Sequence, residues 1–140
     1  MASGPEIGDK APEFTLESTE GTISLADRLA RSAVLLVFYP GDDTPVCTRQ
    51  LCDYRDNLSV FRDLGVDVLA LNTQSLDSHR KFAEKHDLPF PLLADEDGSV
   101  CKAYGASGLL GMTKRALFLV DRDGRVRYRH VDLPVLRRKA

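Results

Sequence analysis

The chain has few cysteines and little excess charge, and each scarcity excludes a class of protein. Three cysteines in 140 residues are too few, and odd in number, for the disulfide framework of a small secreted domain. Nineteen basic and 21 acidic residues give a formal charge of −2, so nothing favours nucleic acid or an anionic membrane as a partner. No apolar run approaches the length of a membrane span, and the N-terminus lacks the features of a signal peptide. We therefore expect a cytoplasmic protein.

Internal repeats and low-complexity segments are also absent from the sequence. A length of 140 residues, 43% of them hydrophobic, is enough for a core of its own without disulfide support. Glycine and proline are scattered as turn markers and do not gather into a linker. We expect a single domain over residues 1–140.

Apolar runs alternate with segments of helical spacing along the chain. Continuous apolar runs favour strands buried on both faces, and apolar residues three and four apart favour helices. The resulting order predicts an α/β domain with a thioredoxin-like fold, in which helices flank a mixed central sheet. Strands are predicted at residues 14–17, 22–24, 33–39, 66–71, 92–94, 116–120 and 126–130, and helices at 25–30, 47–64, 76–86, 97–104 and 135–140.

The segment from Pro40 to Cys52 carries the most informative chemistry. It follows a buried strand and opens a helix, so Cys47 should lie in or next to the first helical turn. Unpaired backbone N–H groups and the helix dipole stabilise a negative sulfur there, and the thiolate is the reactive form of cysteine. A thiolate that attacks a peroxide becomes a sulfenic acid. A nearby guanidinium would favour the thiolate and orient the peroxide, and Arg115 is a candidate for this role.

The motif around Cys47 resembles the signature of the peroxiredoxin family. Pro40, Thr44 and Cys47 match the pattern Pro-x-x-x-Thr-x-x-Cys, and Arg115 opens a stretch similar to the family's Arg-x-x-Phe-x-x-Asp strand. The likeness covers residues 8–131. It implies a thioredoxin-like fold, a hydroperoxide substrate, no metal and no organic cofactor. It also implies that Cys47 is the peroxidatic cysteine, that Thr44 and Arg115 are its hydrogen-bonding partners, and that Pro40 shields the site.

Cys52 follows Cys47 by five residues, a spacing that resembles the bacterioferritin-comigratory, or Q-type, subgroup and implies a resolving cysteine. Five residues of helix rise about 7.5 Å and turn about 140°, which leaves the two Cα atoms roughly 8 to 9 Å apart. A disulfide spans up to about 7 Å, so forming this bond should unwind the first turns of the helix. The resemblance implies that thioredoxin or a similar dithiol then reduces the disulfide. Three alternatives remain open: a one-cysteine peroxidase served by an external thiol, a dithiol oxidoreductase, and a peroxide-responsive redox sensor.

Several other reactive side chains are expected to lie outside the site. Cys101 is interpreted as a small, half-buried core residue, with a second resolving cysteine as the alternative. His79, His86 and His130 are too widely spaced for a compact metal site and are expected on the surface. Gln50 is on the same helical turn as Cys47 but is expected to be exposed.

The end of the chain departs from the family pattern. Only a short stub follows Pro134 where the family has a closing amphipathic helix, so we expect that helix to be missing or shortened. The family's packing at this edge, and with it the oligomer interface, should then differ. We expect a monomer or a weak homodimer.

Overall fold

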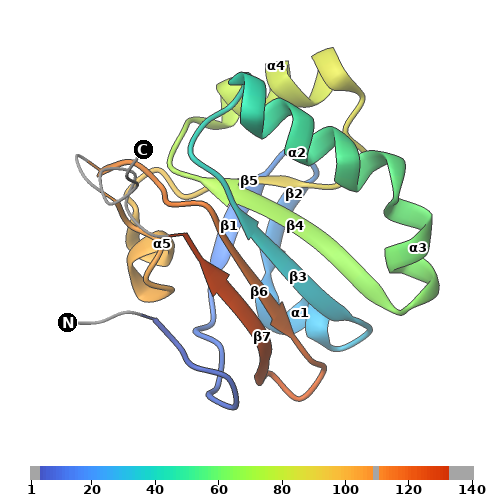
Figure 1. Ribbon diagram of the computed structural model, residues 1–140, viewed down its shortest axis with the longest axis vertical. Coiled ribbons are helices and arrows are strands. Elements are labelled where there is room, and N and C mark those ends of the chain that lie inside the picture. The colour runs from blue at the N-terminus through green and yellow to red at the C-terminus, as the bar shows by residue number, and fades with distance from the viewer. Residues whose placement is uncertain (1–3, 109–110, 133–140) are drawn as a thin grey trace, which may run out of the picture.

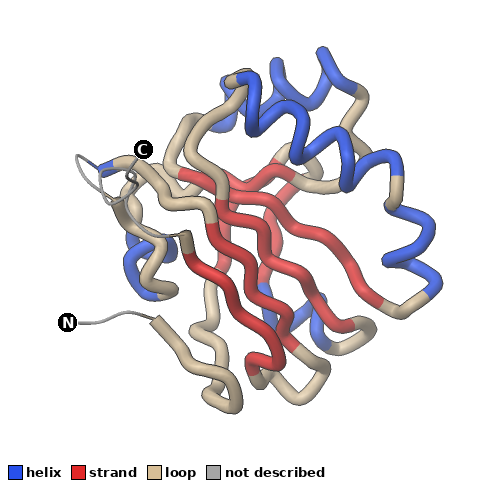
Figure 2. The backbone as a smooth tube through the Cα atoms, in the orientation of Figure 1, coloured by secondary structure: helices blue, strands red, loops and turns tan. Residues whose placement is uncertain are grey.

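A computed structural model describes residues 4–108 and 111–132 of the protein. Seven strands form one central sheet in the order β2-β1-β5-β4-β3-β6-β7, with helices around it (Figures 1 and 2). No helix in the described part of the chain is long and apolar enough to cross a membrane. The strands are β1 (Thr15–Ser18), β2 (Gly21–Ser24), β3 (Ala33–Phe38), β4 (Val66–Asn72), β5 (Leu92–Ala94), β6 (Ala116–Val120) and β7 (Val126–Val131). The helices are α1 (Leu25–Leu29), α2 (Pro45–Asp56), α3 (Leu58–Asp63), α4 (Leu76–His86) and α5 (Ser99–Ala103).

The pairing of the strands confirms the predicted thioredoxin-like fold. β3 and β4 are parallel neighbours at the centre of the sheet, as expected for two continuous apolar runs. The predicted hairpins are β1–β2 and β6–β7, both antiparallel. β6 also pairs antiparallel with β3, with Phe38 opposite Ala116. This register places the start of β6 beside the end of β3, where the segment leading to Cys47 begins.

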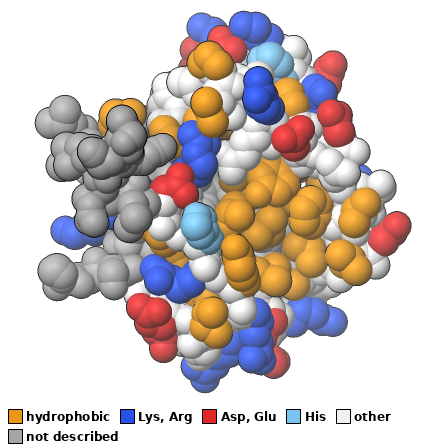
Figure 3. Space-filling model, viewed as in Figure 1, with side chains coloured by type: hydrophobic (Ala, Val, Ile, Leu, Met, Phe, Trp, Pro, Cys, Tyr) orange, Lys and Arg blue, Asp and Glu red, His pale blue; other side chains and the backbone are white. Residues whose placement is uncertain are grey.

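Alternate residues of each central strand point to opposite faces of the sheet and form two separate cores. Leu36 and Phe38 of β3 belong to a cluster with residues of α1 and α5, whereas Val37 and Tyr39 belong to a cluster with residues of α2, α3 and α4. This is the two-residue period of a strand. Figure 1 shows α2, α3 and α4 grouped together, away from α1 and α5. Figure 3 shows hydrophobic side chains at the surface in the region where Figure 1 has β3, β4 and β6.

The single helix predicted over residues 47–64 is wrong in detail, because the structure has two helices there. α2 ends at Asp56 and α3 begins at Leu58, with Asn57 between them at φ −112° and ψ 14°. The Asn57 side-chain amide donates to the backbone carbonyl of Asp53 at 2.8 Å. Asparagine side chains compete in this way for helical backbone groups. Gly65, at φ +76°, follows the second helix as predicted. The predicted turn at 135–140 lies outside the described residues.

Candidate active site

Cys47 lies in the first turn of α2, as the sequence predicts. The helix begins at Pro45, whose fixed φ and missing N–H suit the first helical position, and Thr44 precedes it in an extended conformation. Cys47 is the third residue of the helix and is 1% exposed. Amide groups in this turn have no partner within the helix, and they carry the positive end of the helix dipole. The sulfur therefore lies where the backbone favours a negative charge.

Arg115 reaches Cys47 from a distant part of the sequence. Its guanidinium Nη1 is 3.6 Å from Cys47 Sγ. The contact follows from the fold, because Arg115 immediately precedes β6 and the β3–β6 register places it beside the end of β3. The Arg115 Nε also lies 3.8 Å from a carboxylate oxygen of Asp132, and the Arg115 side chain is 27% exposed. A positive charge thus lies beside a buried sulfur, and the side chain that carries it is itself partly exposed.

Gln50 contacts Arg115 and belongs to the site, although the sequence predicts an exposed residue outside it. The Arg115 Nη1 donates to Gln50 Oε1 at 2.6 Å, and Gln50 is half-buried. Gln50 follows Cys47 by three residues, so the two side chains share one helical face. That spacing was the available signal. Gln50 holds the guanidinium in the position from which it contacts the sulfur.

Thr44 and Pro40 lie close to Cys47 in the chain, but the predicted hydrogen bond between the Thr44 hydroxyl and Cys47 is not formed in the structure. The Thr44 hydroxyl donates to the Gly41 carbonyl at 3.4 Å, whereas the Thr44 carbonyl accepts from the Thr48 amide at 2.8 Å. Thr44 is exposed and Pro40 is half-buried. The hydroxyl therefore stands at the opening of α2 and bonds to the preceding turn in this state.

Cys52 lies within the same helix as Cys47, and the thiols of both residues are free. Cys52 is partly buried against the core on the α2 face of the sheet. Regular helix geometry keeps two Cα atoms at this spacing roughly 8 to 9 Å apart, beyond the ~7 Å limit for a disulfide. The structure therefore describes the reduced arrangement, in which the two sulfurs cannot bond.

Cys101 lies apart from the other two cysteines, on the opposite face of the sheet. It is 1% exposed, in the core cluster formed with α1 and α5, so it is more deeply buried than the half-buried residue that the sequence predicted. Its thiol is 3.5 Å from the Thr113 hydroxyl. Burial raises the pKa of the Cys101 thiol to about 12, which keeps it protonated and unreactive near neutral pH.

A buried polar network adjoins Cys47, and the sequence analysis missed it. The expectation that His79 is a surface residue is wrong, because its side chain is 0% exposed. Its Nδ1 is 2.7 Å from a carboxylate oxygen of Asp42, which lies in the turn between β3 and α2. The same carboxylate accepts from the Tyr39 hydroxyl at 2.5 Å and from the Ser78 hydroxyl at 2.6 Å. A histidine inside a charged helical segment gave no sign of burial in the sequence.

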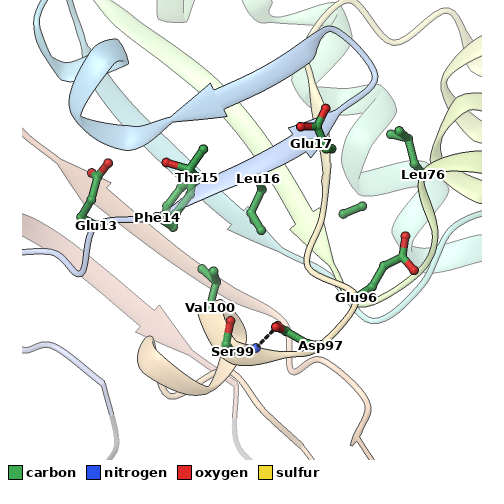
Figure 4. Close-up of a pocket in the computed structure, with 11 residues that line it drawn as sticks. Glu13, Phe14, Thr15, Leu16, Glu17, Leu76, Glu96, Asp97, Ser99 and Val100 are labelled. Carbon is green, nitrogen blue, oxygen red and sulfur yellow. Dashed lines mark hydrogen bonds between the residues drawn. The ribbon is translucent and has the colours of Figure 1, made fainter.

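A hollow in the surface lies away from these residues. It has a volume of about 630 Å³ and lies between β1 and the segment that leads into α5 (Figure 4). Its lining includes Glu13, Glu17, Glu96 and Asp97, and none of the predicted site residues. Because no cysteine lines this acidic hollow, it does not compete with Cys47 as the site of thiol chemistry.

The chain is similar in sequence and in fold to several known proteins. The model of the AhpC/TSA family matches residues 7–129. Peroxiredoxin Bcp of Bacillus subtilis is 37% identical over 130 residues, which cover 86% of this chain and 82% of that protein. The crystal structure of peroxidoxin BcpB from Mycobacterium tuberculosis has a TM-score of 0.85 and 32% identity, over 91% of this chain and 86% of the other. A structure of the bacterioferritin comigratory protein of Xanthomonas campestris, from work on its alkyl peroxide reduction, has a TM-score of 0.80 and 27% identity, over 88% and 83% of the two chains.

Proposed function

Because the chain belongs to the AhpC/TSA family and is a peroxiredoxin, we propose that Cys47 is the sulfur that reduces its peroxide substrate. The observation that carries this assignment is the 3.6 Å contact between Arg115 Nη1 and Cys47 Sγ at the first turn of α2. A positive charge and the helix N-terminus then act together on one thiol. Of the other two cysteines, Cys101 lies on the opposite face of the sheet and has a raised pKa, and Cys52 is in the second half of the helix.

The proposed reaction begins with attack of the Cys47 thiolate on one peroxide oxygen. An S–O bond forms as the O–O bond breaks, and the second oxygen leaves with a proton as water or an alcohol. The sulfur becomes a sulfenic acid. Charge develops on the departing oxygen, and the Arg115 guanidinium is placed to stabilise it. Gln50 fixes the orientation of that guanidinium through its 2.6 Å hydrogen bond. Thr44 and Pro40 border the site and complete the proposed set of residues.

Cys52 is the proposed resolving cysteine. Its thiol attacks the Cys47 sulfenic acid, which releases water and leaves a disulfide between the two sulfurs. α2 must open for this step, because the intact helix keeps the residues beyond bonding distance. Thioredoxin or a similar dithiol then exchanges with the disulfide and restores both thiols. This cycle suits a reducing cytosol, which is the compartment we propose, and it requires no assembly beyond a monomer or weak homodimer.

The proposed substrates are hydrogen peroxide and organic hydroperoxides. Support for the organic class comes from the similarity to the Xanthomonas campestris protein, whose described activity is alkyl peroxide reduction. The partly exposed Arg115 gives such a molecule a charged group to contact beside the buried sulfur. The chemistry at the sulfur is the same for both classes, because each supplies an O–O bond.

A turnover assay with thioredoxin, thioredoxin reductase and NADPH tests this cycle. We expect Cys47→Ser to abolish peroxide-dependent oxidation of NADPH and Cys52→Ser to reduce it strongly, while Cys101→Ser, the matched control, retains it. Full turnover by Cys47→Ser would overturn the assignment of the peroxidatic sulfur. Full turnover by Cys52→Ser would instead indicate a one-cysteine peroxidase that uses an external thiol.

A further inference from the structure

The turn that leads into α2 is held by a buried, hydrogen-bonded pair of side chains. Asp42 lies five residues before Cys47, and its side chain is 3% exposed. It bonds to His79 of α4, whose other ring nitrogen, Nε2, is 2.9 Å from the backbone carbonyl of Leu93 in β5. A chain of contacts therefore connects the turn before Cys47 to a helix and to a strand of the sheet.

Both ring nitrogens of His79 face hydrogen-bond acceptors. A backbone carbonyl accepts hydrogen bonds but cannot donate them, so Nε2 is the donor to Leu93. Burial alone would raise the pKa of Asp42, but hydrogen bonds from His79, Ser78 and Tyr39 lower it below its usual value. The Asp42 carboxylate is therefore the acceptor of all three bonds, and His79 links it to the sheet.

The backbone of the same turn is fixed from a second direction. The Asp42 backbone N–H donates to the side-chain oxygen of Gln74. The Gln74 backbone N–H donates to Asn72 Oδ1 at 2.8 Å. A Cβ atom at Gly41 would lie 3.2 Å from that Gln74 oxygen, so the turn fits closely against it. Both the side chain and the backbone of Asp42 are thus held immediately before the helix that carries Cys47.

We propose that His79, acting through Asp42, is a positioning residue that keeps the first turn of α2 closed around Cys47. This inference rests on the proposed function. The pair has two opposite effects in the catalytic cycle. It favours the step that needs the intact turn, which is oxidation of Cys47 beside Arg115. It opposes the step that needs α2 to open, which is formation of the Cys47–Cys52 disulfide.

The rate of Cys47 oxidation and the rate of Cys47–Cys52 disulfide formation are measured separately in Asp42→Asn and His79→Gln, by rapid mixing of the reduced proteins with hydrogen peroxide. The bonds to the carboxylate are charge-assisted, so their loss should slow Cys47 oxidation by about tenfold or more. Disulfide formation should become faster by a similar factor. A residue that served general stability alone would lower the melting temperature and leave both rates of the folded protein unchanged.

Asp43→Asn is the matched control, because Asp43 is the next residue of the same turn. It is half-exposed and pairs with Lys85 and His86 at the surface, so we expect both rates to stay at wild-type values. Tyr39→Phe and Ser78→Ala each remove one donor to the Asp42 carboxylate, and they decide the question if the first two variants fail to fold. We expect smaller changes in the same opposite directions.

The inference is overturned if folded variants of the network keep both rates, or if both rates change in the same direction, while the wild-type protein reacts normally. A wild-type protein whose Cys47 does not react with peroxide would instead contradict the proposed function. The two failures are therefore distinguishable within one set of measurements.

Discussion

Formation of the Cys47–Cys52 disulfide should open α2 from its start as far as Cys52, and amide hydrogen exchange can measure this. Leu51 lies between the two cysteines and is fully buried. Exposing a leucine side chain costs about 2 kcal/mol, which corresponds to a factor of about 30 in an equilibrium constant. The reduced protein should therefore keep this part of the helix closed for most of the time, and the disulfide should remove that protection.

The assay compares reduced protein with protein oxidised by one equivalent of hydrogen peroxide. We expect amides within residues 45–56 to exchange at least about 30-fold faster after oxidation, while amides of β3 and β4 keep their protection. The control is Cys52→Ser, in which Cys47 can be oxidised but cannot form the disulfide, and there α2 should stay protected. A fully formed Cys47–Cys52 disulfide with unchanged protection across α2 would refute the reasoning.

Three further predictions follow from single contacts. Arg115→Lys should lower the second-order rate of Cys47 oxidation roughly 10²-fold in stopped-flow measurements, because lysine lacks the planar guanidinium whose Nη1 contacts Sγ and Gln50 while its Nε faces Asp132. In a Cys47→Ser/Cys52→Ser protein, Cys101 should resist iodoacetamide at pH 8, because a pKa of about 12 leaves about one thiol in 10⁴ ionised. The same thiol should react fully once guanidinium unfolds the protein, and rapid labelling of the native protein would contradict its burial. The folded protein lowers the pKa of Asp42. Its ionised carboxylate therefore stabilises the fold at pH values above the usual aspartate pKa of about 3.9. This contribution is lost as the pH falls through the lower pKa that Asp42 has in the folded state. Urea unfolding of wild type and Asp42→Asn should therefore differ at pH 6, and the difference should shrink as the pH falls below about 3.9. A difference that stays the same into acidic pH would be inconsistent with this linkage.

The order of strands and helices could be predicted because it depends on local patterns. The apolar runs that became β3 and β4 are continuous, and a buried parallel strand needs no alternation. The break between α2 and α3 could not be predicted, because it depends on one side chain. Asn57 bonds to a carbonyl of the preceding turn, whereas the hydrophobic spacing continues across it.

Some contacts of the candidate site could likewise be predicted from neighbouring residues in the chain, and others could not. The place of Cys47 at the start of a helix follows from its position after a strand and a proline, which are neighbours in the chain. The contact of Arg115 with the sulfur depends on the β3–β6 register, so resemblance to a family, and not spacing, pointed to it. His79 and Asp42 are 37 residues apart, and no local pattern distinguishes a buried, hydrogen-bonded pair from two surface residues.

The assignment of Cys47 as the peroxidatic cysteine is tested most directly by identifying which sulfur reacts first. Reduced protein can be mixed with one equivalent of hydrogen peroxide in the presence of a sulfenic acid trap, and the cysteine-containing peptides identified by mass spectrometry. In Cys52→Ser, we expect the trap on Cys47 and an unmodified Cys101; in the wild-type protein, we expect a disulfide between Cys47 and Cys52. A trap found first on Cys101, or a Cys47 that stays reduced while peroxide persists, would contradict the central claim.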